Sequence, residues 1–241
     1  MELAGRVALV TGAGRRVGRA IALRLAQAGM RVVVHYHRSA EAAAETVAAC
    51  QAAGAEAIAL SADLADSAAA AGLVEQTLSR CGRLDVLVNN ASTYERMTID
   101  EFDLAAWEQA LRVNLTAPMV LAAAARDALR AARGRVINLG DVSVSRPWPD
   151  HLAYMVSKGG LDTLTRVLAR ALAPEVNVVG IAPGVAEWPP EYSAELRERL
   201  TRRIPLGRAG SPEDIAAAVH FVLAAGDYIT GAILPVDGGR H

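Results

Sequence analysis

The feature that most constrains the fold of this chain is its alternation of short apolar runs with longer Ala- and Leu-rich segments. The short runs lack a polar–apolar alternation, which is typical of strands that are covered on both faces. Their order predicts an α/β fold with one parallel, doubly wound sheet of about seven strands and helices on both faces. We expect strands at residues 6–10, 31–36, 56–61, 84–89, 135–139, 176–181 and 232–236. We expect helices at residues 17–29, 39–53, 66–81, 101–131, 152–173 and 212–225.

The bulk composition limits how the chain is organised and what it binds. No Pro-, Gly- or Ser-rich linker and no internal repeat divides the sequence, which predicts one domain over residues 1–241. The long irregular segment 183–210 is rich in proline and charge, and we expect a substrate loop at about 185–205. A net charge of −1 argues against a nucleic-acid partner. Two cysteines and no long apolar stretch predict a cytoplasmic protein without a membrane partner.

A glycine-rich segment, VTGAGRRVGRA, follows the first expected strand and opens the first expected helix. Gly12 and Gly14 allow a tight turn, and Gly18 allows close packing, so that helix amides can point at a pyrophosphate. A glycine pattern alone also fits an ordinary strand–helix turn. Its position after the first strand, with a complete β-α-β unit following, favours a Rossmann-type dinucleotide site.

The end of the second expected strand indicates which dinucleotide binds. An NAD site usually has an acidic side chain there, which holds the ribose diol. Here the strand runs into three side chains that suit a 2′-phosphate: His37, Arg38 and Ser39. Arg15 and Arg16 add positive charge from the glycine-rich segment. The sequence therefore favours NADPH, and the alternative is a solvated basic turn.

A tyrosine and a lysine are spaced for proton transfer in the expected helix 152–173. Tyr154 and Lys158 lie four residues apart and so share one face of that helix. Lys158 is the only lysine among the 25 Lys and Arg residues, which favours a specific need for a compact ammonium. A nearby cation lowers the pKa of a phenol from about 10, so we expect Tyr154 to exchange protons near neutral pH.

Many motifs, spread over nearly the whole chain, resemble the short-chain dehydrogenase/reductase family. They are TGAGRRVG, ADL (62–64), NNA (89–91), VNL around Asn114, YMVSK, APG (182–184) and ITG to VDGG (230–239). The resemblance implies that Asn114 orders a proton-relay water, that Tyr154 is the acid and that Lys158 holds the cofactor ribose. It implies that Asp63 contacts the adenine and that Asn90 holds the loop beside the nicotinamide ribose. Further expected cofactor contacts are Gly12, Arg15, Arg16, Val17, Gly18, Leu64, Ala91, Pro183 and Gly184.

Three departures from the general family pattern occur together. Arg16 replaces a further glycine, Ser92 replaces the glycine that usually follows NNA, and Asp141 replaces the catalytic serine. This combination resembles the pteridine reductase branch. The resemblance implies that Tyr94 stacks on a pterin, that Arg16 lies near the cofactor phosphate and the pterin, and that Ser92 lies in the pocket. The alternatives are that Tyr94 packs on the domain and that Ser92 and Arg16 only fill loops.

The expected function is NADPH-dependent reduction of pteridines, from dihydropterin to tetrahydropterin and with folates as further candidates. Asp141 and Tyr154 would relay the proton, and Trp188 would close over the ligand or else anchor the loop by packing. One alternative is a general carbonyl or alcohol oxidoreductase that tolerates Asp141. Another is a catalytically silent NADP(H)-binding regulatory protein, against which the intact Tyr154, Lys158 and Asn114 count.

Two further expectations concern metals and assembly. No metal site is expected in this sequence. The expected helices 101–131 and 152–173 are apolar over more than one face. The family pairs such helices into tetramers, so the resemblance implies a homotetramer.

Overall fold

The computed structural model describes residues 1–188 and 192–240, and its centre is one parallel sheet. The strand order is β3-β2-β1-β4-β5-β6-β7, and every neighbouring pair is parallel. The strands are β1 (Val7–Val10), β2 (Arg31–Tyr36), β3 (Ala57–Ser61), β4 (Val86–Asn89), β5 (Arg135–Leu139), β6 (Asn177–Pro183) and β7 (Ile233–Val236). This topology confirms the predicted doubly wound sheet.

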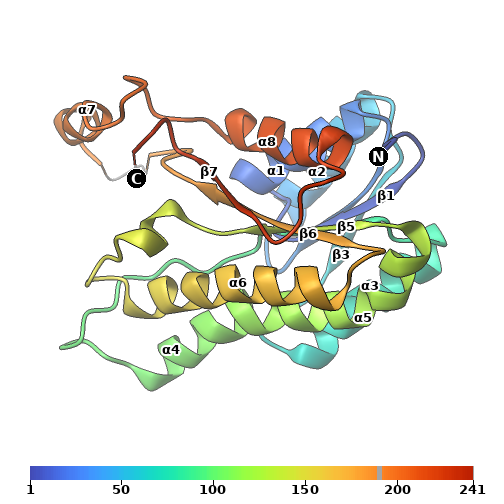
Figure 1. The fold of residues 1–241 in the computed structure, drawn as a ribbon, viewed down its shortest axis with the longest axis horizontal. Coiled ribbons are helices and arrows are strands. Elements are labelled where there is room, and N and C mark those ends of the chain that lie inside the picture. Colours follow the sequence, from blue (N-terminus) through green and yellow to red (C-terminus); the bar gives the residue numbers. More distant parts are fainter. Residues whose placement is uncertain (189–191, 241) are drawn as a thin grey trace.

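Helices cover both faces of the sheet (Figure 1). One layer holds α1 (Arg16–Gln27), α2 (Ala40–Ala52) and α8 (Pro212–Ala225). The other holds α3 (Ser67–Cys81), α4 (Leu104–Leu111), α5 (Ala117–Ala132) and α6 (Leu152–Ala171). None of the helices within residues 1–188 and 192–240 has the length and apolar character needed to cross a membrane.

The apolar runs of the sequence have no alternation because both faces of the strands are buried. In β1, Ala8 and Val10 pack in the hydrophobic cluster on one face of the sheet. Val7 and Leu9 pack in the cluster on the other face. Successive side chains of a strand point to opposite faces, so a strand between two helix layers is apolar at every position.

Two segments differ from the expected elements. The expected helix 101–131 is divided by a π-helical turn, Arg112–Thr116, which separates α4 from α5 and carries Asn114. The expected loop 185–205 contains a helix, α7 (Ala194–Thr201), whose Ser193 side chain accepts a hydrogen bond from Leu196 N. Residues 189–191 of that loop lie outside the described residues.

The strand order creates one place where the connections run in opposite directions. β1 lies between β2 and β4. The chain builds the sheet outward from β1 through β2 and β3 on one side, and through β4 to β7 on the other. In open α/β sheets a crevice forms at such a point, beyond the carboxyl ends of the strands. The topology therefore predicts a binding site at this point.

Candidate active site

A cleft of about 1180 Å³ lies beyond the carboxyl ends of the strands. Its lining comes from the segments that follow β1, β2, β3, β4, β5 and β6. All of the predicted site residues except Asn114 line it: Gly12, Arg15, Arg16, Val17, Gly18, His37, Arg38, Ser39, Asp63, Leu64, Asn90, Ala91, Ser92, Tyr94, Asp141, Tyr154, Lys158, Pro183, Gly184 and Trp188. The structure thus brings distant parts of the sequence into one cavity.

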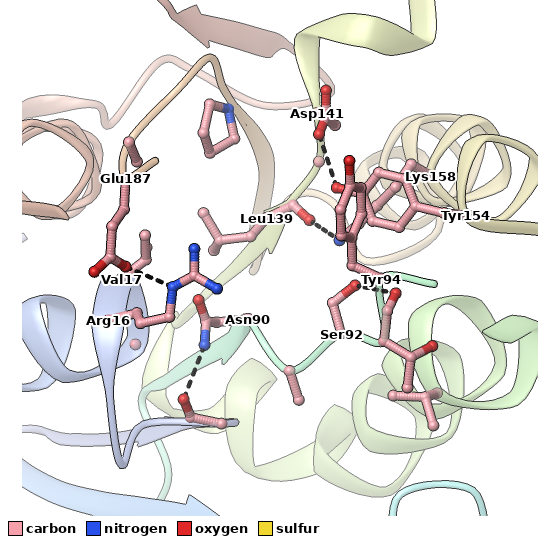
Figure 2. Close-up of a pocket in the computed structure, with 18 of the residues that line it drawn as sticks. Arg16, Val17, Asn90, Ser92, Tyr94, Leu139, Asp141, Tyr154, Lys158 and Glu187 are labelled. Carbon is pink, nitrogen blue, oxygen red and sulfur yellow. Dashed lines mark hydrogen bonds and ion pairs between the residues drawn. The ribbon is translucent and has the colours of Figure 1, made fainter. Parts of the chain in front are cut away.

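The glycine-rich segment forms a turn that only small residues can make. Gly12 has a φ of 63°, in the left-handed region that favours glycine. A Cβ on Gly18 would overlap the Gly12 carbonyl oxygen and the Asn90 amide. Asn90 Nδ2 donates to Thr11 O at 2.8 Å and to Gly12 O at 3.2 Å, and so holds this turn from the end of β4 (Figure 2).

A buried histidine supports the same turn and was missed by the sequence analysis as a site residue. His35 Nδ1 accepts a hydrogen bond from Gly12 N at 3.1 Å, and its Nε2 lies 3.1 Å from Ala62 O. These partners require the neutral ring with its proton on Nε2. Burial lowers the pKa of His35 to about 4, against the opposing hydrogen bond to Ala62. The only local signal is a polar residue inside an apolar strand.

The side chains at the far end of the cleft fit a phosphorylated ribose. Arg15, Arg38 and Ser39 line the cleft. Among residues 1–188 and 192–240, neither Arg15 nor Arg38 has an ion-pair partner. His37 lies 3.8 Å from Asp63 and is charged there only if protonated. No carboxylate follows β2 where an NAD site would need one, so the donor set fits a 2′-phosphate.

Asp141, Tyr154 and Lys158 meet at the other end of the cleft (Figure 2). Tyr154 Oη donates to Asp141 Oδ2 at 2.7 Å. Lys158 Nζ donates to Leu139 O at 2.7 Å and lies 5.7 Å from the centroid of the Tyr154 ring. The other oxygen of Asp141 accepts from Ser143 N at 2.7 Å, which fixes the carboxylate at the start of the short helical turn Val142–Ser145.

The electrostatics of this group differ from the expectation for Tyr154. Burial, followed by the Asp141 carboxylate, raises the pKa of Tyr154 well above its usual value. Burial lowers the pKa of Lys158 to about 8, while Asp141 and Asp162 oppose that shift. The expectation that Lys158 brings the Tyr154 pKa down toward neutrality is therefore wrong for this structure, because burial and then the negative charge of Asp141 act in the opposite direction.

Asn114 lies outside the cleft lining and connects two of its walls. Its Oδ1 accepts from Thr93 N at 2.8 Å, and its Nδ2 donates to Thr93 O and to Ser157 Oγ, both at 3.0 Å. The side chain thereby fastens the loop that carries Tyr94 to helix α6 beside Lys158. The predicted ordering of a relay water by Asn114 stays a prediction.

An aromatic wall borders the catalytic group. The Tyr94 ring stacks on His151 with a centroid distance of 4.5 Å and an interplanar angle of 21°. It also meets the Tyr154 ring edge-on at 4.8 Å, and Trp148 packs edge-on against His151 at 5.6 Å. These contacts agree with the alternative that Tyr94 packs on the protein, although the residue remains 49% exposed. Across the cleft, Trp188 lies 6.2 Å from the Tyr192 ring.

Arg16 has an unusual backbone conformation and an ion-pair partner that the sequence did not indicate. Its φ is 52°, a left-handed value that is uncommon for residues other than glycine and costs free energy. Its Nε lies 2.5 Å from Glu187 Oε2, which joins the glycine-rich turn to the segment before residue 189 (Figure 2). Ser92 lies in the cleft lining as predicted, and its Oγ donates to Thr93 O at 3.2 Å.

The chemical groups of the cleft include no cluster of metal-ligating side chains among the described residues. Residues 1–188 and 192–240 contain no group of three or more His, Cys, Asp or Glu side chains that could hold a metal ion. The cleft offers instead a tyrosine, a carboxylate and a lysine beside a dinucleotide-sized groove. These groups suit proton transfer coupled to hydride transfer.

Comparisons with known proteins agree with this arrangement. A family model described as enoyl-(acyl carrier protein) reductase matches residues 12–241. The rhamnolipid-biosynthesis 3-oxoacyl-[acyl-carrier-protein] reductase of Pseudomonas aeruginosa is 38% identical, over 100% of this chain and 98% of its own. A structure of a blue fluorescent protein from a metagenomic library, in complex with NADPH, is 34% identical with a TM-score of 0.93, over 100% of this chain and 99% of its own.

A further solved structure is similar over the whole chain. FolM alternative dihydrofolate reductase 1 from Brucella canis, complexed with NADP, is 34% identical with a TM-score of 0.93, over 100% of this chain and 95% of its own. The family match supports oxidoreductase chemistry, but these matches do not single out the pteridine reductase branch. The topology, the Tyr154–Lys158 pair and these matches lead to one conclusion: the chain belongs to the short-chain dehydrogenase/reductase family.

Proposed function

We propose that this protein is an NADPH-dependent reductase of dihydropteridines. The cofactor assignment has two independent supports. Three similar solved structures are complexes with NADPH or NADP. Arg15, Arg38 and Ser39 line the cleft where β2 ends without a carboxylate, and their donors match a 2′-phosphate. Gly18 leaves the close approach that a pyrophosphate needs, because a Cβ there would fill the turn.

The observation that carries the substrate proposal is the 2.7 Å hydrogen bond between Tyr154 and Asp141. Bound NADPH supplies the hydride to a ring carbon of the substrate. The neighbouring ring nitrogen must then take a proton, and this phenol–carboxyl pair is placed to donate it and to recover one from solvent. The carboxyl group can also accept hydrogen bonds from ring N–H donors, which a ketone substrate lacks.

The electrostatics of the pair suit proton donation. Burial, followed by the Asp141 carboxylate, raises the pKa of Tyr154, so the phenol keeps its proton near neutral pH and is available as a donor. Lys158, with its ammonium on Leu139 O, would hold the ribose of the bound cofactor beside this phenol. The two residues thus have separate roles in the proposal: proton supply and positioning.

A second candidate is a general short-chain carbonyl or alcohol oxidoreductase. The comparisons back this broader reading better than the pteridine reading, since a relative at 38% identity is named a 3-oxoacyl-[acyl-carrier-protein] reductase. Two observations favour a pteridine substrate. One is the contact of Asp141 with Tyr154, and the other is the likeness to a protein named an alternative dihydrofolate reductase. The aromatic wall of Tyr94, Trp148 and His151 suits a flat ring, although His151 already covers one face of Tyr94.

A substrate panel separates the two candidates. NADPH oxidation is followed with a dihydropterin, with a 3-oxoacyl thioester, and with neither, at matched concentrations of the purified full-length protein. The proposal expects a higher kcat/KM for the dihydropterin than for the ketone. A chain that reduces the thioester and leaves the dihydropterin untouched is a carbonyl reductase, and the pteridine proposal then fails.

A further inference from the structure

A second cavity of about 350 Å³ adjoins the main cleft. Its lining consists of Val142, Ser143, Ser145, Arg146, Trp148, Arg203 and Arg240. Four of these residues line both cavities: Val142, Ser143, Trp148 and Arg240. Because Val142 directly follows Asp141, the small cavity begins one residue from the proposed catalytic carboxylate.

The small cavity is strongly basic. Three of its lining residues are arginines and none is acidic. In the part of the chain that the structure describes, the guanidinium groups of Arg146, Arg203 and Arg240 have neither an ion pair nor a hydrogen bond to another residue. By contrast, the nearby Arg202 and Arg208 pair with Glu198 and Asp214.

Three segments far apart in the sequence bring these charges together. Arg146 follows the helical turn after β5, Arg203 follows α7, and Arg240 follows β7. Like charges gathered around one small space repel each other, and an anion in that space offsets the repulsion. Guanidinium groups bind carboxylate and phosphate oxygens through paired N–H donors, and Ser143 and Ser145 add hydroxyl groups to the same wall.

We infer that this cavity binds an anionic substituent, a carboxylate or a phosphate, on the substrate that is reduced in the main cleft. The ring would lie beside Tyr154, and the substituent would pass Trp148 to reach Arg146 and Arg203. The inference rests on the proposed function for the identity of the ring, but the anion site itself does not depend on it. It assigns the substrate class as heterocycles that carry a negatively charged tail.

The test compares substrates that differ in the tail. The full-length enzyme is given a dihydropterin with a neutral side chain, one with a phosphate ester on that side chain, and dihydrofolate, whose tail carries carboxylates. We expect a higher kcat/KM with at least one charged tail, and the two charged arms tell phosphate from carboxylate. The double variant Arg146→Gln/Arg203→Gln should lower the ratio of charged to neutral kcat/KM by about tenfold or more, mainly through KM.

The matched control is Arg202→Gln, which removes a neighbouring guanidinium that pairs with Glu198 and lies outside the cavity. It should leave the charged-to-neutral ratio as in the unchanged protein. Thermal unfolding of each variant shows whether the fold is retained, and Arg203→Lys keeps the charge if the glutamine variant unfolds. An unchanged ratio in a folded double variant would overturn the inference.

A binding experiment keeps the inference separate from the proposed function. The protein is saturated with NADP⁺, so that the cofactor site takes up no further anion, and is titrated with glutarate and with inorganic phosphate in a calorimeter. We expect saturable binding of at least one anion that the double variant weakens and Arg202→Gln does not. If no pteridine is reduced but this binding is seen, the proposed function fails and the anion site stands. Absence of binding, together with no tail preference, refutes the site.

Discussion

At the scale of single residues, the chemistry of this site depends on which charges surround one phenol. Burial, followed by the Asp141 carboxylate, raises the pKa of Tyr154, which lies beside the only lysine in the chain. Lys158 is itself buried, and its pKa is lowered to about 8, so it sits close to losing its charge in mildly alkaline solution. Near neutral pH the tyrosine therefore keeps its proton. The lysine is charged there but loses its charge at a lower pH than an exposed lysine does.

Lys158→Arg tests whether the compact ammonium is required. The guanidinium keeps the positive charge but cannot occupy the buried space beside Leu139 O in the same geometry. We expect kcat to fall by about 10²-fold or more, within the range that general acid–base catalysis supplies. Arg170→Lys, near the exposed end of the same helix, is the control and should leave kcat as it is. Native turnover in Lys158→Arg would show the lone lysine to be incidental.

Arg38→Ala tests the cofactor assignment. Arg38 lines the cleft after β2, where its guanidinium is available for a 2′-phosphate. Losing one charge-assisted contact should raise KM for NADPH by about 10- to 100-fold while KM for NADH changes little. Arg80→Ala, at the end of α3 and outside the cleft, serves as the control. Equal changes for both cofactors would refute the 2′-phosphate contact.

The sequence predicted these residues unevenly, and the reason is the range of their interactions. Gly12, Tyr154 and Lys158 carry local signals, because a turn or a helical spacing reveals them within a few residues. Glu187 carries none, since its partner Arg16 lies 171 positions away. The direction of the Tyr154 pKa shift was missed because it depends on how deeply the phenol is buried beside Asp141, which only packing determines.

At the scale of elements, the turn after β1 is held from two neighbouring strands. Asn90 holds it from β4, and His35 holds it from β2 while also contacting Ala62 after β3. The strand positions were predictable from the apolar runs, but this bracing was not, since it depends on the register between β1 and β2. Helix α7 was missed because it is short, charged and preceded by prolines.

The bracing histidine predicts a defined acid sensitivity. Its folded-state pKa of about 4 lies below the unfolded value near 6.5, so the unfolded chain binds the proton more readily. The contribution of neutral His35 to the free energy of unfolding is therefore fully present above pH 6.5. It is lost as the pH falls toward 4, which lowers the free energy of unfolding by up to roughly 3 kcal/mol. Protonation also removes the acceptor for Gly12 N.

His35→Asn isolates this effect. The asparagine oxygen can still accept from Gly12 N but does not titrate. Urea unfolding of the cofactor-free protein at pH 7 and at pH 4.5 should show a smaller loss of free energy of unfolding in the variant than in the unchanged protein. An equal loss in both would mean that other groups cause the acid sensitivity.

At the scale of the whole molecule, one sheet with two helix layers places every segment of the site at one edge. All seven strands belong to this sheet, and we retain one domain over residues 1–241 as a proposal. The homotetramer is likewise a proposal. Its support is the apolar surface on two helices of one layer, where Met119 of α5 and Val156 and Val167 of α6 are 42%, 50% and 56% exposed.

Val167→Arg tests this assembly. A charge placed in a packed interface is costly to bury, so we expect the sedimentation profile to move from a tetramer toward smaller species. Gln76→Arg puts the same charge on the exposed polar surface of α3 and should leave the profile unchanged. A monomer in the unchanged protein, or a tetramer in Val167→Arg, would contradict the proposed interface.

Single-turnover hydride transfer by Asp141 variants is the sharpest test of the proposed role of Asp141. Bound NADPH is mixed with dihydropterin or with a ketone, and its loss of absorbance gives the rate of the chemical step. Asp141→Asn keeps the shape but cannot take up and pass on a proton, so dihydropterin reduction should fall by about 10²-fold or more, with NADPH affinity little changed. Asp141→Ser should also lose dihydropterin reduction, and it should gain weak ketone reduction. If both variants reduce dihydropterin at the native rate, Asp141 has no part in the chemistry and the pteridine proposal loses its main support.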